Sequence, residues 1–207
     1  MLRTLLPALL TASVLFVPGP ASAQTQPVVF RSHHKAEELH FFGVGPRGDL
    51  NPPELDLLGK LMRCWRTGGI HSIHPRLARH LVGISRHFHS PVVVVSGYRA
   101  VSRSGRRRSY HLQGMAADIY VDGVPSIEVR DLAVASRIEG IGFYPNSGFI
   151  HLDVRPRRFW WVDYSRPGHS DRLVPDPEGD APAEPEPSKV LSEQVVAPPE
   201  AEEHLDG

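Results

Sequence analysis

The chain has 207 residues, enough for one domain with a hydrophobic core and additional terminal segments. Its formal net charge of zero is the balance of two unlike regions, because residues 24–170 carry 20 Lys and Arg against 12 Asp and Glu, whereas residues 171–207 carry 2 against 11. The single cysteine, Cys64, excludes an intrachain disulfide and cysteine-rich zinc sites, and its apolar helical pattern predicts an inert core residue. The basic region predicts an anionic partner, a description that fits both nucleic acid and an anionic cell-wall polymer.

Residues 1–23 have the features of a cleavable secretory signal peptide. Arg3 supplies a positive charge, residues 5–17 form a short apolar core, and Ala21-Ser22-Ala23 matches an A-x-A cleavage site. The apolar run is too short for a good membrane span, so we expect no integral membrane segment after cleavage. The alternative is an uncleaved N-terminal anchor.

Residues 24–170 alternate between helical and strand-like patterns, which indicates one domain with both element types. Helices are predicted from Asn51 to the Gly68-Gly69 stop, over 75–89, and over about 127–138 with Gly140 as its end. Strands are predicted within 27–50 and at 91–95, 116–121, 141–144 and 149–154. Residues 171–207 are rich in Pro, Glu, Asp and Ala, and this composition predicts a disordered acidic tail with no identified partner.

Three side chains of metal-ligand type fall on or beside two of these strands. His111 precedes the strand that carries Asp118, and His151 lies on the strand at 149–154. Because side chains alternate between the faces of a strand, His151 and Asp153 share one face, while the aliphatic residues between them face the core. Gly114 would let the backbone turn and bring His111 over the other two. Two imidazoles and one carboxylate leave a fourth position for water, which is typical of a catalytic zinc site.

With these motifs the sequence resembles the zinc peptidases of the D-Ala-D-Ala carboxypeptidase and hedgehog-like superfamily, and within it the murein endopeptidase K group. The resemblance spans roughly residues 30–162 and rests on several motifs. They are Ser96-Gly97-Tyr98-Arg99, Ser109-x-His111-x-x-Gly114-x-Ala116-x-Asp118, and Gly140-Ile141-Gly142-Phe143-Tyr144-Pro145 followed by Phe149-Ile150-His151-Leu152-Asp153, together with Arg66-Thr67-Gly68 and His74-Pro75-Arg76-Leu77.

The resemblance implies an α+β fold with a small, mostly antiparallel sheet flanked by helices. It also implies one Zn²⁺ per chain on His111, Asp118 and His151, and hydrolysis of peptide cross-links in peptidoglycan by a periplasmic endopeptidase. Peptidoglycan, and not nucleic acid, is then the expected partner. The alternatives are a D,D- or L,D-carboxypeptidase that trims stem peptides, and a non-catalytic zinc-containing module that binds the cell wall.

The chain departs from the resemblance at two points, which are the position of the general base and the segment from Arg99 to His111, shorter and more basic than is usual for the group. Many members of the superfamily place an acidic residue or histidine two or three positions before the last metal ligand, where this chain has Phe149 and Gly148. Asp153 is the available carboxylate, and it is predicted to be either the general base or a partner that orients a ligand.

Arg99 is predicted to stabilise the oxyanion or to hold a substrate carboxylate, with a structural brace as the alternative. The other predicted contributors are Ser109, Tyr98 and Tyr144, through hydrogen bonds or substrate contact.

Overall fold

The computed structural model describes residues 26–100, 109–166 and 173–175. The predicted signal peptide and most of the predicted tail therefore lie outside the described residues. No helix in these ranges has both the length and the apolar character needed to cross a membrane.

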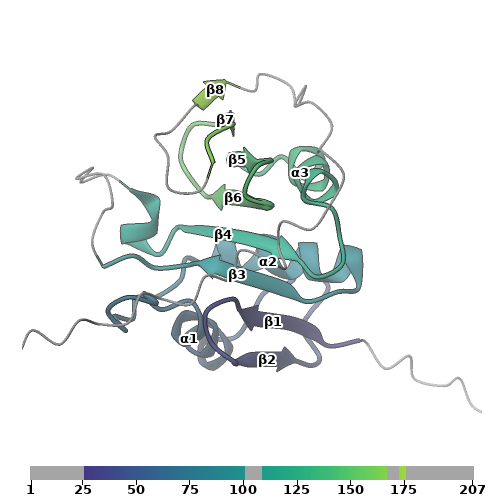
Figure 1. Cartoon of the computed structure of the whole chain (residues 1–207). Helices are drawn as coiled ribbons and strands as arrows, with labels where there is room; N and C mark the ends of the chain where they lie inside the picture. The colour runs from purple at the N-terminus through teal and green to yellow at the C-terminus, as the bar shows by residue number, and fades with distance from the viewer. Residues whose placement is uncertain (1–25, 101–108, 167–172, 176–207) are drawn as a thin grey trace, which may run out of the picture.

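Eight strands in the described ranges form one mixed sheet in the order β2-β1-β3-β4-β6-β5-β7-β8 (Figure 1). The strands are β1 (Val28–Ser32), β2 (Glu38–Phe41), β3 (Val92–Ser96), β4 (Ala116–Val121), β5 (Gly140–Tyr144), β6 (Phe149–Asp153), β7 (Phe159–Asp163) and β8 (Leu173–Pro175). The β1–β3 and β5–β7 pairs are parallel, and the other neighbouring pairs are antiparallel. The predicted α+β class with a mostly antiparallel sheet is confirmed.

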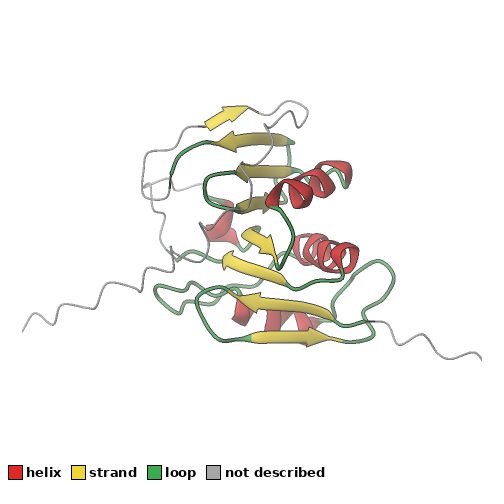
Figure 2. Cartoon of the chain, turned by 45° about the vertical axis from the view of Figure 1, so that its right-hand side comes forward, coloured by secondary structure: helices red, strands yellow, loops and turns green. Residues whose placement is uncertain are grey.

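The three α-helices of the described ranges gather on one side of the sheet (Figure 2). They are α1 (Pro52–Leu61), α2 (Pro75–Phe88) and α3 (Ser126–Ala135). Asn51 begins α1 with a capping box to Glu54, and His74 begins α2 by accepting the backbone N–H of Arg76. The helices bury their apolar stripes against alternate residues of the strands, such as Ile119 and Ile150, so one hydrophobic core fills the space between the two layers.

Helix α1 is shorter than its apolar spacing predicts. It ends at Leu61, and Trp65 lies beyond it with 42% of its surface exposed, because the chain turns back before another helical turn can form. Cys64 is buried as predicted but also lies beyond the helix. Burial alone would raise the pKa of its thiol, but hydrogen bonds from neighbouring backbone and from Thr67 lower the pKa to about 7.

Two further boundaries differ from the prediction. Gly140 does not end α3 but begins β5; the helix ends at Ala135, and Arg137 takes the left-handed conformation with φ 56°. Within the segment predicted to be a disordered tail, residues 173–175 form β8, which pairs with β7 at the edge of the sheet. The composition of this segment did not predict the strand. A strand that pairs through its backbone with the edge of a formed sheet can do so with few apolar side chains.

The side of the sheet opposite the helices carries the polar motif residues, and Gly142 makes room there. Gly142 is paired with both His151 and Trp161 on its neighbouring strands. A Cβ atom at Gly142 would lie 2.5 Å from Cε2 of the Trp161 indole. The indole therefore lies across the glycine and reaches the imidazole of His151, with 5.1 Å between the ring centroids.

Replacing Gly142 by alanine is expected to displace the Trp161 indole and to lower the free energy of unfolding by about 1–3 kcal/mol. Denaturant unfolding measures this effect. Gly83→Ala is the matched control, because Gly83 is an exposed glycine within α2 with no atom near its Cβ position, and there the change should stabilise by roughly 0.5–1 kcal/mol. Equal stability of the Gly142→Ala variant and the unmodified protein would contradict the close packing.

Candidate metal centre

A short 3-10 helix, η1 (Tyr110–Gln113), carries His111 to the sheet. It ends at Gly114, which has φ 64° and whose missing Cβ would lie 2.1 Å from the carbonyl oxygen of Ser72. Both the left-handed backbone and the close contact exclude a larger side chain, so the predicted role of Gly114 in turning the chain is confirmed. The orientation of the His111 ring is fixed by a residue outside η1, because its Nδ1 donates a hydrogen bond to the carbonyl oxygen of Gly97 at 2.7 Å.

The other two metal donors, meaning side chains with an atom that could bind a metal ion, face each other on adjacent strands. Asp118 on β4 and His151 on β6 are directly opposite in the antiparallel register. Their neighbours in sequence, Ile119 and Ile150, point to the helices and are fully buried. The predicted alternation of the two strands is confirmed, and it brings the carboxylate and the imidazole together on the face away from the helices.

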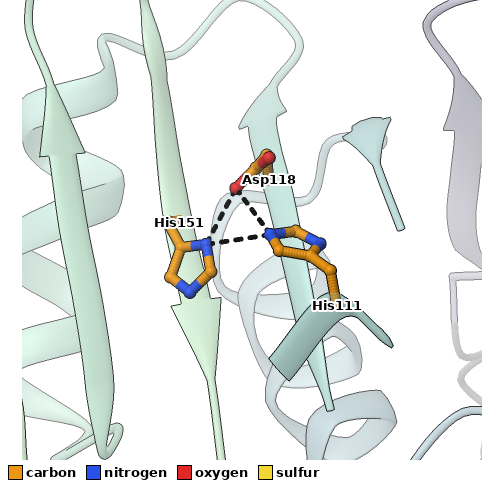
Figure 3. A group of neighbouring side chains, drawn as sticks. All are labelled: His111, Asp118 and His151. Carbon is orange, nitrogen blue, oxygen red and sulfur yellow. Dashed lines mark hydrogen bonds and ion pairs between the residues drawn. The ribbon is translucent and has the colours of Figure 1, made fainter. Parts of the chain in front are cut away.

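The side chains of His111, Asp118 and His151 point toward one another (Figure 3). Nε2 of His111 lies 3.2 Å from Nδ1 of His151, and Oδ1 of Asp118 lies 3.3 Å and 2.9 Å from these two nitrogens. The three residues are 2%, 4% and 8% exposed. One ligand atom from each lies within 4.8 Å of the others, so this group could hold a metal ion.

The ring nitrogen that carries the hydrogen in each histidine explains why a cation fits between the three side chains. The carbonyl oxygen of Gly97 can only accept, so Nδ1 of His111 carries the hydrogen of that neutral ring and Nε2 presents a lone pair. In the same way Nε2 of His151 donates to the Asp153 carboxylate at 3.0 Å, which leaves Nδ1 facing inward. Two ring nitrogens and a carboxylate oxygen thus converge, and a positive charge between them offsets their mutual repulsion.

The pKa shifts follow the same arrangement. Burial lowers the pKa of His111, and the adjacent Asp118 only partly opposes this effect. When no metal is bound, a proton on an inward-facing ring nitrogen can take the place of the cation. Burial alone would raise the pKa of Asp118, but the charge of a protonated His111, the charge of Arg99 and the hydrogen bonds that protonated rings donate hold it well below its usual value. Burial alone would likewise lower the pKa of His151, but its hydrogen bonds to Asp118 and Asp153 raise it.

Asp153 is fully buried on the outer side of His151. Its Oδ2 accepts from Nε2 of His151, the ring nitrogen that does not face the other donors. Its Oδ1 accepts the backbone N–H and the Nε–H of Arg155 at 3.0 and 2.8 Å, and Oδ2 also meets a terminal nitrogen of that guanidinium. Burial alone would raise the pKa of Asp153, but the hydrogen bonds from Arg155 and His151 lower it to about 2.

Arg99 contacts the remaining oxygen of the metal-facing carboxylate. A terminal nitrogen of its guanidinium pairs with Oδ2 of Asp118, and its Nε donates to Oγ of Ser96 at 2.9 Å. Its backbone N–H also donates to the carbonyl oxygen of His111. These contacts are the ones expected if Arg99 is a structural brace, which was the alternative to a role at the oxyanion. About a third of the Arg99 side chain remains exposed.

The remaining sequence-predicted residues have other contacts. Tyr98 stacks on His71 with 5.0 Å between ring centroids, and Ser109 precedes η1 without a side-chain cap hydrogen bond. Within the described residues, neither hydrogen-bonds to one of the three donor side chains. Tyr144 stacks on Phe149, and its hydroxyl oxygen accepts the indole N–H of Trp161 at 3.3 Å.

Sequence reasoning missed two residues that support the group. Trp161 was not among the predicted site residues, yet its indole packs against His151. Arg155 was not predicted at all, although it follows Asp153 by two positions. An Asp-x-Arg pair at a strand end is too common to indicate such a contact without the fold.

Comparison with known proteins identifies the family of the chain. The sequence profile of the family described as peptidoglycan L,D-endopeptidase MepK matches residues 21–160. The chain belongs to this family. The resemblance to the murein endopeptidase K group inferred from the motifs is therefore confirmed.

Relatives from two organisms extend the comparison. The chain is 36% identical over 122 residues to the protein of Haemophilus influenzae named probable peptidoglycan L,D-endopeptidase MepK, an alignment that covers 53% of this chain and 66% of that protein. It is 30% identical over 165 residues to peptidoglycan L,D-endopeptidase MepK of Escherichia coli K12, covering 73% of this chain and 90% of that protein. No solved structure matches.

The convergence of donors predicts that the purified protein retains about one divalent metal ion per chain after dialysis. His111→Ala and His151→Ala should each lose this metal, because each removes one of the three ligands. Elemental analysis of the dialysed proteins measures it. His87→Ala is the control, since His87 is exposed on α2 on the helical side of the sheet. Full metal content in a His111→Ala, His151→Ala double variant would contradict the site.

Proposed function

We propose that this chain is a zinc-dependent peptidase that hydrolyses peptide bonds between an L- and a D-centre in peptidoglycan cross-links. The observation that carries the proposal is the convergence of three metal donors from η1, β4 and β6 in a member of this family. Both relatives are named as L,D-endopeptidases, which supports the choice of bond. The positive charge of residues 24–170 suits an anionic polymer as substrate.

Zinc would be held by His111 through Nε2, His151 through Nδ1 and Asp118 through Oδ1, the atoms that face one another. Two imidazoles and one carboxylate are a typical donor set for catalytic zinc. The chemistry supplied by a bound zinc would be a water whose pKa is lowered to about 7 and a polarised scissile carbonyl. Asp118 would also contribute negative charge to the site, since its surroundings hold the pKa of its carboxyl well below the usual value.

Asp153 orients His151 and is not the general base. The support is its position, since its carboxylate meets the ring nitrogen on the side away from the other donors and is enclosed by Arg155. Asp153 accepts a hydrogen bond from Nε2–H of His151 and so keeps the ring hydrogen on Nε2. The lone pair then stays on Nδ1, the atom that would bind the metal.

Arg99 holds Asp118 in place through Oδ2 and leaves Oδ1 for the metal. Because a third of its side chain is exposed, the same guanidinium also contacts the substrate at the developing oxyanion or a stem-peptide carboxylate. Tyr98, Ser109 and Tyr144 shape the surrounding surface for the peptide.

The proposed compartment is the periplasm, reached by export through residues 1–23. The n-region charge, the short apolar core and the A-x-A site of this segment support export, and the proposed substrate lies outside the cytoplasm. Fractionation of expressing cells measures the location of the protein.

Replacing Asp153 by asparagine separates the two roles considered for this residue. If it orients His151, zinc affinity should fall by roughly 10–100-fold, because the ring loses its charged acceptor. Titration against a chromophoric chelator measures the affinity. Unchanged zinc affinity together with a large loss of kcat would instead make Asp153 the base. Asp122→Asn serves as the control, because Asp122 is an exposed carboxylate just after β4 that pairs with Arg31.

The proposed reaction is tested on purified sacculi that contain both L,D and D,D cross-links. Mass spectrometry of the released muropeptides should show loss of L,D cross-linked dimers and a matching gain of monomers, and a chelator should prevent both changes. Zinc should restore activity after the chelator is removed.

Other products identify the rival functions. Release of single terminal residues from stem peptides would indicate a carboxypeptidase. Binding to sacculi without any new product, with zinc bound, would indicate a non-catalytic cell-wall module.

A further inference from the structure

The guanidinium of Arg155 occupies the outer side of the metal centre. It lies just beyond β6, with its side chain 16% exposed, and it contacts both oxygens of the fully buried Asp153. A buried carboxylate with a facing guanidinium is held in one orientation, because the two planar groups form parallel hydrogen bonds.

Three aromatic rings surround the same guanidinium. Its central carbon lies 5.2 Å from the ring centroid of Tyr110, 5.1 Å from that of Trp161 and 5.5 Å from that of Phe159. Each distance is within the range of a cation–π contact, and enclosure by rings removes competing water. The rings and the carboxylate together restrict the rotamers open to Arg155.

These contacts connect Arg155 to two donor residues on different elements. Through Asp153 it reaches the outer nitrogen of His151 on β6. Through Tyr110 it reaches η1, where the next residue is His111. Trp161 adds a second path, because its indole contacts both Arg155 and the ring of His151.

We infer that Arg155 is a positioning residue of the metal centre, which holds the Asp153 carboxylate against His151 and ties η1 to the end of β6. The inference rests on the proposed metal-dependent function. Arg155 contacts none of the three metal-donor atoms directly; it determines how closely the donors already match the geometry of the ion. A prearranged site binds its metal more tightly, because less ordering free energy is spent on binding.

The test compares substitutions of Arg155 in the full chain. Arg155→Met keeps an unbranched side chain among the rings and removes the charge. Its Zn²⁺ dissociation constant, measured on metal-free protein with a competing chromophoric chelator, should rise by roughly 10–100-fold. Arg155→Lys keeps the positive charge but not the two-pronged guanidinium. Its Zn²⁺ dissociation constant should lie between those of the unmodified protein and Arg155→Met. In the Co²⁺-substituted protein the visible absorption bands should shift, which reports the geometry of the ligands directly.

Arg158→Met is the matched control. Arg158 follows three positions later, is exposed, and also has its guanidinium over an indole, at 5.4 Å from Trp160. Its loss should leave zinc affinity and the Co²⁺ spectrum unchanged. Thermal unfolding of each metal-free variant shows whether the fold is intact, and if Arg155→Met does not fold, Arg155→Lys supplies the comparison.

A double-variant cycle with Asp153→Asn decides whether Arg155 acts through Asp153. If it does, the effects of Arg155→Met and Asp153→Asn on zinc affinity should be less than additive. Full additivity, or unchanged zinc affinity and Co²⁺ spectrum in folded Arg155→Met protein, would overturn the inference. A wild-type protein that binds no metal would instead refute the proposed function itself.

Discussion

The antiparallel pairing of β4 with β6 is the constraint on which the rest of the site depends. Asp118 faces His151 in this register, and Ile119 faces Ile150 on the other side of the same two strands. A shift of β6 by one residue would turn His151 into the core and Ile150 toward the site, and would separate His151 from Asp118. The hydrophobic effect therefore holds two metal donors in position without any metal, because the free energy gained from the buried aliphatic residues opposes the shift.

Each of the three metal donors also has a hydrogen-bonding partner on the side that faces away from the other two donors. The carbonyl oxygen of Gly97 fixes His111, Arg99 holds the second oxygen of Asp118, and Asp153 fixes His151. Each partner leaves one lone pair pointing inward. A divalent cation of matching size could complete this arrangement, which suits the residues to a metal-dependent peptidase.

Much of this could be read from the sequence because the relevant patterns are local. Alternation along 116–121 and 149–154 predicted which side chains share a face, and Gly114 predicted the turn that carries His111. The three donors were predicted by residue type and by resemblance to a family, and the fold class followed from the order of the elements. Helix ends were less accurate, because Trp65 continues the apolar spacing of α1 although the chain has already turned away.

The sequence by itself determined the fold class, the family and the three donor residues, since each is encoded in short motifs and their spacing. Only the tertiary structure decided what surrounds those donors. The fold encloses Asp153 behind His151, a position that favours the orienting role over that of the base. Arg155 had no signal in the sequence, because Tyr110 and Trp161 surround it only in the folded chain. The physical reason is that these contacts join η1, the end of β6 and β7 in space, and no periodicity along one segment records which side chains of separate segments will meet.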